Sequence, residues 1–313
     1  MKDPLLFTRR DFGKLALAGL PLSLAFADIN SKFKGVQIGA ITYSFRSMSN
    51  PDDIINAYKT IGLGEMELMS GDAEKLAGAP VPAGIGGGRR GMTPEQQAEM
   101  TKAQEALRAW RMSATEATFR PVKKKIEDAG IDLQILCYNM NVNSTKDDEI
   151  EYGFMMAKAL GVNVISTSTQ VSMAKRTAPF ADKHKIKLAF HGHDQTQNPD
   201  EVASPDTFAA VTAASKYHAI NLDIGHFTAA NFDPVSYIQQ HHDRITHLHL
   251  KDRKKDHGPN VPWGQGDTPI KQVLLLLRDK KYKIPGNIEF EYPGDPMVEI
   301  PKCVQYAKEV LNS

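Results

Sequence analysis

The sequence predicts a single α/β domain that folds as a (β/α)8 barrel. Eight short strand-like runs alternate with helix-like segments along most of the chain. Several of these runs are apolar almost throughout, as expected of parallel strands that are buried on both faces. All ten histidines lie between His184 and His257, and five of them fall in segments at the ends of three predicted strands. Because parallel strands of a barrel end at one rim, this distribution also predicts a functional site there.

The predicted strands are separated by stretches long enough to hold a helix, and this repeat is typical of a closed parallel barrel. In chain order the strands are Val36–Phe45, Glu65–Met69, Asp132–Asn139, Asn163–Ser168, Lys187–His191, Ile220–Gly225, Ile245–Leu250 and Asn287–Tyr292.

Helix signals follow these strands. Asn50–Asp53 and Ser204–Asp206 each place a capping residue before a proline, which is favoured at the first helical position. Asp267–Pro269 opens a further helix with a run of leucines, and Asp147–Leu160 ends at Gly161. These signals predict helices on the outside of the barrel.

One region departs from the simple repeat. The segment from Gly78 to Gly91 is rich in glycine and proline and predicts a loop, interpreted as either a lid over the barrel mouth or a surface insertion. Gly86-Gly87-Gly88 is not a phosphate-binding fingerprint, because no strand leads into it. Thr93–Gln96 is a good helix start, and a long charged helix is expected from there towards Ala129.

The N-terminus carries the parts of a bacterial export signal in the right order. Thr8–Lys14 contains a twin arginine, Leu15–Phe26 is apolar, and Ala25–Ala27 is an A-x-A cleavage site. The apolar run is too short to span a bilayer. We therefore expect residues 1–27 to be removed, and residues 28–313 to form a periplasmic barrel that is not bound to the membrane.

The bulk composition fits one large domain. Removing 27 residues from 313 leaves 286, modestly more than the ~250 residues of a typical (β/α)8 barrel. The net charge of +1 argues against a nucleic-acid-binding protein. Cys137 and Cys303 could pair in the periplasm, but they fall in an apolar strand and a terminal helix, so two buried free thiols are favoured.

Side chains that can bind a metal occupy alternate positions of the last strands. Alternate residues share one face of a strand, so these groups point inward together while the apolar residues between them pack outward. Burying such groups is costly unless they are paired or bound to a metal. Imidazole and carboxylate together suit a divalent transition metal. The candidates are His191, His193, Asp223, His226, His247, His249, Lys251, Glu289 and Glu291.

The ordered set of motifs resembles the xylose isomerase-like TIM barrels of the sugar phosphate isomerase/epimerase superfamily. The resemblance covers essentially all of the chain after residue 27 and lies in IGAITYSFR (38–46), MELM (66–69), FHGHD (190–194), LDIGH (222–226), HLHLKDR (247–253), WGQGD (263–267) and IEFEY (288–292).

The resemblance implies one divalent metal ion (Mn, Mg, Co or Zn). Its implied ligands, carried over position by position, are His191, Asp223, His249 and Glu289. His191 departs from the family, whose sugar epimerases have glutamate there. Because that glutamate also exchanges the substrate proton in ketose epimerases, its loss puts a symmetric two-glutamate epimerisation in doubt. Glu289 and Glu291 could also exchange their roles as ligand and base.

The resemblance further implies removal of a proton next to the carbonyl of an unphosphorylated sugar or keto-sugar. Reprotonation at carbon gives isomerisation or epimerisation, whereas expulsion of a β-oxygen gives dehydration or elimination by a lyase. The expected catalytic residues are Glu291, His193, Lys251 and Glu67, with Glu67 facing the mouth. The expected substrate contacts are His226, Tyr43, His247 and Trp263, although Trp263 could instead only pack at the rim.

Three rival interpretations follow from the same residues. An endonuclease IV-like nuclease is disfavoured by the net charge and by the export signal. A two-lobed periplasmic sugar-binding protein is disfavoured by the single eightfold repeat. A non-catalytic barrel that only binds a sugar stays open, as do the sugar, the metal and the formation of a homo-oligomer.

Overall fold

The computed structural model describes residues 29–80 and 93–313. The predicted export signal, residues 1–27, lies outside the described residues, as does most of the predicted Gly78–Gly91 loop, including Gly86–Gly88. Within the described part, no helix combines the length and the apolar character needed to cross a membrane.

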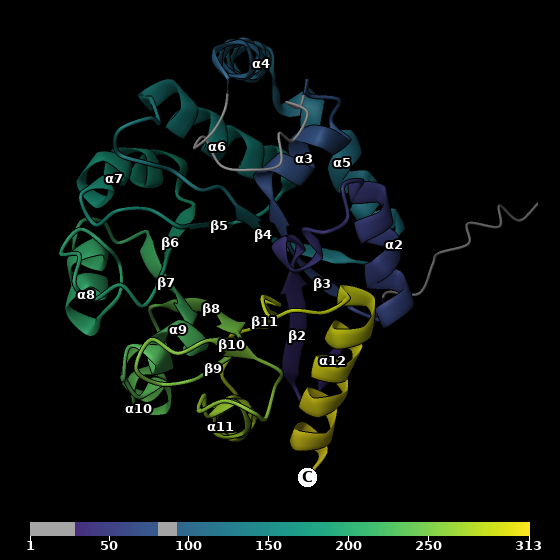
Figure 1. Ribbon diagram of the computed structural model, residues 1–313, viewed down its shortest axis with the longest axis vertical. Helices are drawn as coiled ribbons and strands as arrows, with labels where there is room; N and C mark the ends of the chain where they lie inside the picture. The colour runs from purple at the N-terminus through teal and green to yellow at the C-terminus, as the bar shows by residue number, and fades with distance from the viewer. Residues whose placement is uncertain (1–28, 81–92) are drawn as a thin grey trace, which may run out of the picture.

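The described chain forms a closed barrel of parallel strands, which confirms the predicted (β/α)8 fold. The strands pair in the order β2-β11-β8-β7-β6-β5-β4-β3, and pairing of β2 with β3 closes the ring. Figure 1 looks along the barrel. The strands are β2 (Val36–Ile41), β3 (Glu65–Met69), β4 (Asp132–Cys137), β5 (Val164–Thr167), β6 (Lys187–His191), β7 (His218–Asp223), β8 (Ile245–Leu250) and β11 (Gly286–Ile288).

Helices surround this barrel (Figure 1). They are α2 (Pro51–Ile61), α3 (Ser70–Leu76), α4 (Pro94–Ser113), α5 (Glu116–Asp128), α6 (Asp147–Leu160), α7 (Met173–His184), α8 (Pro205–Ala213), α9 (Ile224–Ala229), α10 (Pro234–His241), α11 (Ile270–Lys280) and α12 (Pro296–Asn312). Short strands β1 (Lys32–Phe33), β9 (Asp252–Arg253) and β10 (Asn260–Val261) lie outside the ring.

The helix ends predicted from capping residues agree with the structure. The Asn50 side chain accepts a hydrogen bond from Asp52 N, with Pro51 as the first residue of α2. Gly161 ends α6 with φ 74°, a left-handed conformation that glycine adopts readily. Ser204 caps α8 by accepting from Thr207 N.

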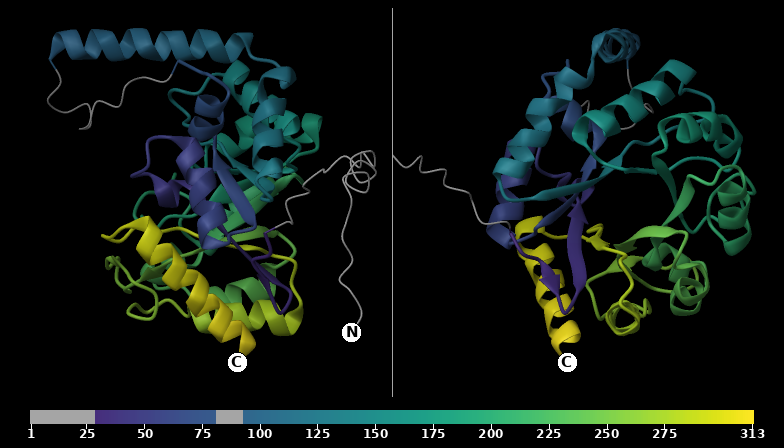
Figure 2. Two further views of the ribbon diagram at one scale, coloured as in Figure 1. Left: turned by 90° about the vertical axis from the view of Figure 1, so that its right-hand side faces the viewer. Right: turned by 180° about the vertical axis from the view of Figure 1, so that it is seen from behind.

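The expected single helix from Thr93 to Ala129 is wrong, because two helices occupy this region. The chain turns to extended conformation at Ala114 and Thr115, and Thr115 N donates to Thr118 Oγ1 as α5 begins. α4 buries none of its residues and projects beyond the ring of helices (Figure 2). A threonine that caps a new helix competes with continuation of the old one.

The first and last barrel strands are shorter than predicted, for a shared reason. Thr42–Phe45 forms a 3-10 turn, η2, instead of continuing β2. Ser44 Oγ then donates to Ile288 O and accepts from Phe290 N, both at 2.9 Å. On the side that faces β2, the Ser44 side chain therefore replaces the strand ladder beyond Ile288, while Glu289 N still donates to Leu250 O of β8 at 3.2 Å.

Apolar residues of the strands pack outward as expected. Leu248, Leu250, Ile288 and Phe290 all belong to the buried apolar core. Cys137 and Cys303 are buried and unpaired, as predicted. The barrel interior also holds buried polar side chains, among them Glu65, Glu67, Ser166, Asn221, His247 and Asn287. These polar side chains lie inside the barrel, next to the strand ends that form the site.

Candidate metal centre

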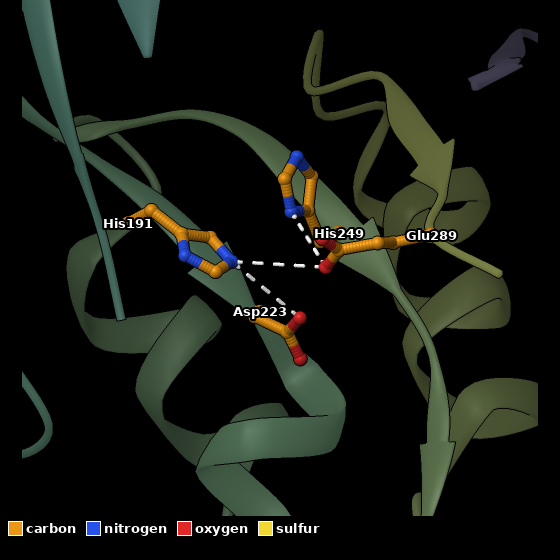
Figure 3. A group of neighbouring side chains, drawn as sticks. All are labelled: His191, Asp223, His249 and Glu289. Carbon is orange, nitrogen blue, oxygen red and sulfur yellow. Dashed lines mark hydrogen bonds and ion pairs between the residues drawn. The ribbon is translucent and has the colours of Figure 1, made fainter. Parts of the chain in front are cut away.

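Four side chains from successive strands converge at the rim of the barrel (Figure 3). His191 ends β6, Asp223 ends β7, His249 lies on β8 and Glu289 follows β11. One ligand atom from each lies within 4.8 Å of the others. His191 Nε2 is 3.6 Å from Asp223 Oδ2 and 3.8 Å from Glu289 Oε2, and His249 Nδ1 is 3.1 Å from Glu289 Oε2. These are the four residues that the sequence resemblance implies.

The chemistry of this cluster fits a divalent metal ion. All four residues are buried. Among residues 29–80 and 93–313, neither His191 Nε2 nor Asp223 Oδ2 makes a hydrogen bond, although both atoms are buried and Asp223 Oδ2 forms an ion pair with Lys251. Buried polar atoms without a partner are rare and require an explanation. Two imidazoles and two carboxylates that face one another could hold a transition-metal ion such as zinc.

The short helix α9 explains why Asp223 faces the cluster. Asp223 caps α9, and its Oδ1 accepts from His226 N at 2.7 Å. The other carboxylate oxygen is thereby left for the cluster. Gly225 permits this turn, because a Cβ there would lie 2.8 Å from the Lys251 side chain. The sequence Asp223-Ile224-Gly225-His226 therefore aims one carboxylate oxygen inward.

Lys251 supplies one positive charge beside the cluster. Its Nζ lies 3.1 Å from Asp223 Oδ2, 2.9 Å from Glu289 Oε2 and 2.5 Å from Glu291 Oε2. Burial lowers the pKa of Lys251, but Asp223 and the two glutamates outweigh it and raise that pKa. Three carboxylates against one ammonium leave an excess of negative charge that a divalent cation would balance.

Burial and charge also set the protonation of the ligand candidates. Burial lowers the pKa of His191 to about 3, so its imidazole is neutral and able to bind a metal. Burial raises the pKa of Asp223, but Lys251, His226 and His191 together outweigh it and hold that pKa below its ordinary value. The pKa of Glu289 is lowered in the same way by Lys251 and His249. Both carboxyl groups are therefore ionised at neutral pH.

A cavity of about 370 Å³ opens above the cluster. Its lining includes three of the four ligand candidates and four further residues that the sequence predicts as catalytic or substrate-binding. The ligand candidates in this lining are His191, His249 and Glu289, and the other predicted residues are Tyr43, His193, His226 and Glu291. Lys251 lies just below them, buried against Glu291.

Glu67 and His247 do not face the mouth, so both expectations are wrong. Both side chains are fully buried and neither lines the cavity. Glu67 Oε2 accepts from His249 Nε2 at 2.8 Å and from Asn287 Nδ2 at 3.1 Å, and His247 Nε2 lies 3.5 Å from Glu67 Oε2. Both residues sit deeper in the barrel than the strand ends.

Trp263 packs at the rim and does not reach the cavity. Its ring meets Tyr306 edge to face with centroids 5.8 Å apart, in a separate surface depression. The loop turns there because Asp252 Oδ2 accepts from Gly264 N and Gly266 N at 2.8 and 2.9 Å. Of the two expectations for Trp263, rim packing is the one that its position supports.

Several cavity residues were missed at the sequence level. Asn221 lies two residues before Asp223 on β7, so strand alternation alone could have placed it on the inner face. Ser166 and Ser168 likewise line the cavity from the end of β5. Glu201 lies behind the cavity wall, eight residues after His193 in the loop that follows β6, and contacts its ring; no sequence pattern marks this pair.

Comparisons with known proteins agree with this architecture. Residues 168–312 match a sequence profile described as a xylose isomerase-like TIM barrel. An inosose dehydratase of Salmonella typhimurium is 29% identical over a region that covers 41% of this chain and 46% of the relative. An inosose dehydratase of Clostridium perfringens is 24% identical, covering 42% and 50%. The chain thus spans about half the length of the curated relatives it matches.

Solved structures show the fold over nearly the whole chain. A probable 3-DHS dehydratase from Bacillus anthracis aligns with TM-score 0.60 and 15% identity, covering 89% of this chain and 99% of its own. The IOLI protein with a bound zinc atom aligns with TM-score 0.60 and 13% identity, covering 88% and 96%. A sugar phosphate isomerase/epimerase from Parabacteroides distasonis aligns with TM-score 0.57 and 14% identity, and the alignment covers 92% of this chain and 99% of that protein. The fold is therefore that of the xylose isomerase-like barrels.

Proposed function

We propose that this chain is an enzyme of the xylose isomerase-like superfamily. It binds one divalent metal ion and removes a proton next to the carbonyl of an unphosphorylated sugar or keto-sugar. The observation that carries this proposal is the buried cluster of His191, Asp223, His249 and Glu289 beneath an accessible cavity. The matches to inosose dehydratases and to a zinc-containing barrel support it.

The four clustered residues would hold the metal, and Glu67 would orient one of them. When bound, the ion would act as a Lewis acid on substrate oxygens. His249 Nε2–H donates to Glu67 Oε2, so the metal would bind at Nδ1, which faces Glu289 Oε2 in the cluster and would give up its proton. A carboxylate in this position fixes the tautomer of a metal-binding histidine and raises its basicity. Glu67 is thus a positioning residue rather than a base that meets the substrate.

The groups that move protons are His193 and Glu291. Both line the cavity, His193 just beyond β6 and Glu291 beyond β11. The base takes a proton from the carbon next to the carbonyl, and the electron pair of the broken C–H bond moves towards the carbonyl oxygen. Lys251 Nζ donates to Glu291 Oε2 and so fixes the position of that carboxylate. His226 lines the same wall and would shape it, because its ring nitrogens face Lys251, Asp194 and Arg253.

Dehydration is the favoured outcome. His191 stands where sugar epimerases of this superfamily have their second glutamate, which removes the symmetric pair of bases. Loss of a β-hydroxyl as water completes the elimination once the α-proton has left. Two matched relatives named inosose dehydratase support this outcome. Epimerisation is the second candidate, because His193 and Glu291 give the cavity two groups that can carry a proton.

The test combines elemental analysis with NMR of candidate keto-sugars in D₂O. Stoichiometric metal with formation of an unsaturated or deoxygenated product supports dehydration. Deuterium at carbon with the carbon–oxygen skeleton retained supports epimerisation or isomerisation. Metal without exchange on any keto-sugar that binds would instead favour a non-catalytic sugar-binding barrel.

We also propose that residues 1–27 direct export to the periplasm by the twin-arginine route. The support is the sequence pattern alone. Cell fractionation would find the processed protein in the periplasm. Replacing Arg9 and Arg10 together by lysine should leave the precursor in the cytoplasm, and continued export of that variant would reject the route.

A further inference from the structure

His193 holds one ring nitrogen in a hydrogen bond and leaves the other free. Its Nδ1 lies 2.5 Å from Glu201 Oε1. In the part of the chain that the structure describes, Nε2 of His193 has no hydrogen-bond partner. The ring lines the cavity, with the side chain 27% exposed. A carboxylate that accepts from Nδ1–H selects the tautomer whose Nε2 lone pair is available.

His226, the other non-ligand imidazole of this wall, differs in this respect. Its Nε2 lies 3.1 Å from Lys251 Nζ, and its Nδ1 is flanked by Asp194 Oδ1 at 3.1 Å and Arg253 Nη1 at 2.6 Å. Both nitrogens of His226 are therefore occupied by protein groups. Of the two rings, only His193 offers a free nitrogen to the cavity.

The backbone around Glu201 is fixed on both sides. Glu201 forms an antiparallel bridge with Gln170. The backbone carbonyl of the next residue, Val202, accepts a hydrogen bond from His193 N at 2.8 Å. Asp200 Oδ1 accepts from Ser172 N at 2.7 Å. Glu201 is thus held against the histidine by its neighbours in the chain and needs no rearrangement to reach Nδ1.

We propose that Glu201 is a positioning residue that presents Nε2 of His193 to the substrate as the acid–base nitrogen. This inference rests on the proposed function above. When Nε2 takes the proton, the C–H bond breaks, an N–H bond forms, and the electron pair stays with the substrate. The new positive charge on the imidazole lies beside the Glu201 carboxylate, which stabilises it. Glu201 itself touches neither the substrate nor the metal.

The experiment compares Glu201→Gln with a matched control, Glu151→Gln. Glu151 Oε1 lies 3.0 Å from His184 Nε2 between α6 and α7, so it makes the same kind of carboxylate–imidazole pair on the outside of the barrel. ¹⁵N-histidine NMR reports the tautomer of each ring without any turnover. Steady-state kinetics on the keto-sugar found above, together with metal content, report the consequence.

For Glu201→Gln we expect the Nδ1–H tautomer signal of His193 to be lost. We expect kcat to fall by ~10–100-fold, the usual effect of losing a residue that orients a functional histidine. KM should stay within about threefold, because Glu201 does not touch the substrate. Metal content should not change. Glu151→Gln should alter only the His184 signals. An unchanged His193 tautomer, an altered tautomer with unchanged kcat, or loss of metal in Glu201→Gln would each overturn the proposal. If the wild-type protein turns over no keto-sugar, the proposed function fails, while the NMR comparison still tests the Glu201–His193 orientation.

Discussion

His249 and Glu67 are joined deep in the barrel by a 2.8 Å hydrogen bond from Nε2 to Oε2, on the opposite side of the imidazole from Glu289. Glu67 is fully buried and also accepts from Asn287 Nδ2. Burial lowers the pKa of His249, but Glu67 and Glu289 outweigh it and raise that pKa. Metal binding at Nδ1 would therefore displace a proton, and Glu67 would stay bonded to Nε2–H.

Glu67→Gln should weaken metal binding by ~10–100-fold, the usual cost of losing a carboxylate that orients a metal-binding histidine. The measurement is competition with a chelator of known affinity. Glu65→Gln is the matched control, because Glu65 is also fully buried and its pKa is raised by burial and by Glu67, so glutamine mimics its neutral form. Equal metal affinity in both variants would argue against the orienting role.

Lys251→Met should destabilise the metal-free protein by roughly 3–5 kcal/mol, because it leaves Asp223, Glu289 and Glu291 without their buried partner. Added metal should restore much of this loss. Chemical denaturation with and without metal measures both effects. Lys254→Met should change stability by less than ~0.5 kcal/mol, because the Lys254 side chain is 45% exposed and its ion pair with Asp267 lies at the surface. Similar losses in the two variants would contradict the pairing.

The stability of metal-free protein should fall as the pH drops below neutral. Burial lowers the pKa of His191 to about 3 in the folded state, against about 6.5 when unfolded. The unfolded state therefore binds the extra proton first, and the stabilisation present above about pH 6.5 is lost as the pH falls towards 3. Between about pH 6.5 and pH 5 the loss from this residue is ~2 kcal/mol.

Denaturant unfolding of His191→Gln at the same pH values checks this assignment. Glutamine does not titrate, so the free energy of unfolding of His191→Gln should depend less steeply on pH than that of the wild type. The same slope in both proteins would assign the acid sensitivity to other groups.

Tyr43 and Trp263 should differ in their effect on substrate binding. Tyr43 is 36% exposed and lines the cavity, whereas Trp263 packs on Tyr306 in another depression. Tyr43→Ala should raise KM by ~10-fold through lost contact, and Trp263→Ala should leave KM within about twofold. The reverse order would mean that the substrate reaches the loop of Trp263.

The fold and the inward direction of the clustered side chains could be predicted because they depend on local patterns. Alternation along β8 and after β11 places His249 and Glu289 on the inner face, and the turn after Asp223 follows from its capping role. Alternation left nine candidates, and only the resemblance to xylose isomerase-like barrels narrowed them to the four.

Depth within the barrel could not be predicted in the same way. Alternation tells which face a residue occupies, but the height of Glu67 and His247 relative to the rim depends on the stagger between strands. That stagger includes a register shift between Met66 and Glu67 and another between Ile220 and Asn221. Glu201 reaches His193 because the loop after β6 folds back, so that Val202 O accepts from His193 N. The two residues are only eight apart in the chain, but no helix or strand periodicity marks their contact.

The metal content of the purified protein and of its Asp223 and His249 variants tests the metal centre most directly. Asp223→Asn keeps a side-chain oxygen that can cap α9 but removes the charged ligand. Asp233→Asn makes the same change at the cap of α10, at an exposed hydrogen bond. We predict one equivalent of divalent metal in the wild type and in Asp233→Asn, and loss of most of it in Asp223→Asn and His249→Ala with helical content retained. Full metal occupancy in both Asp223→Asn and His249→Ala would contradict the metal centre.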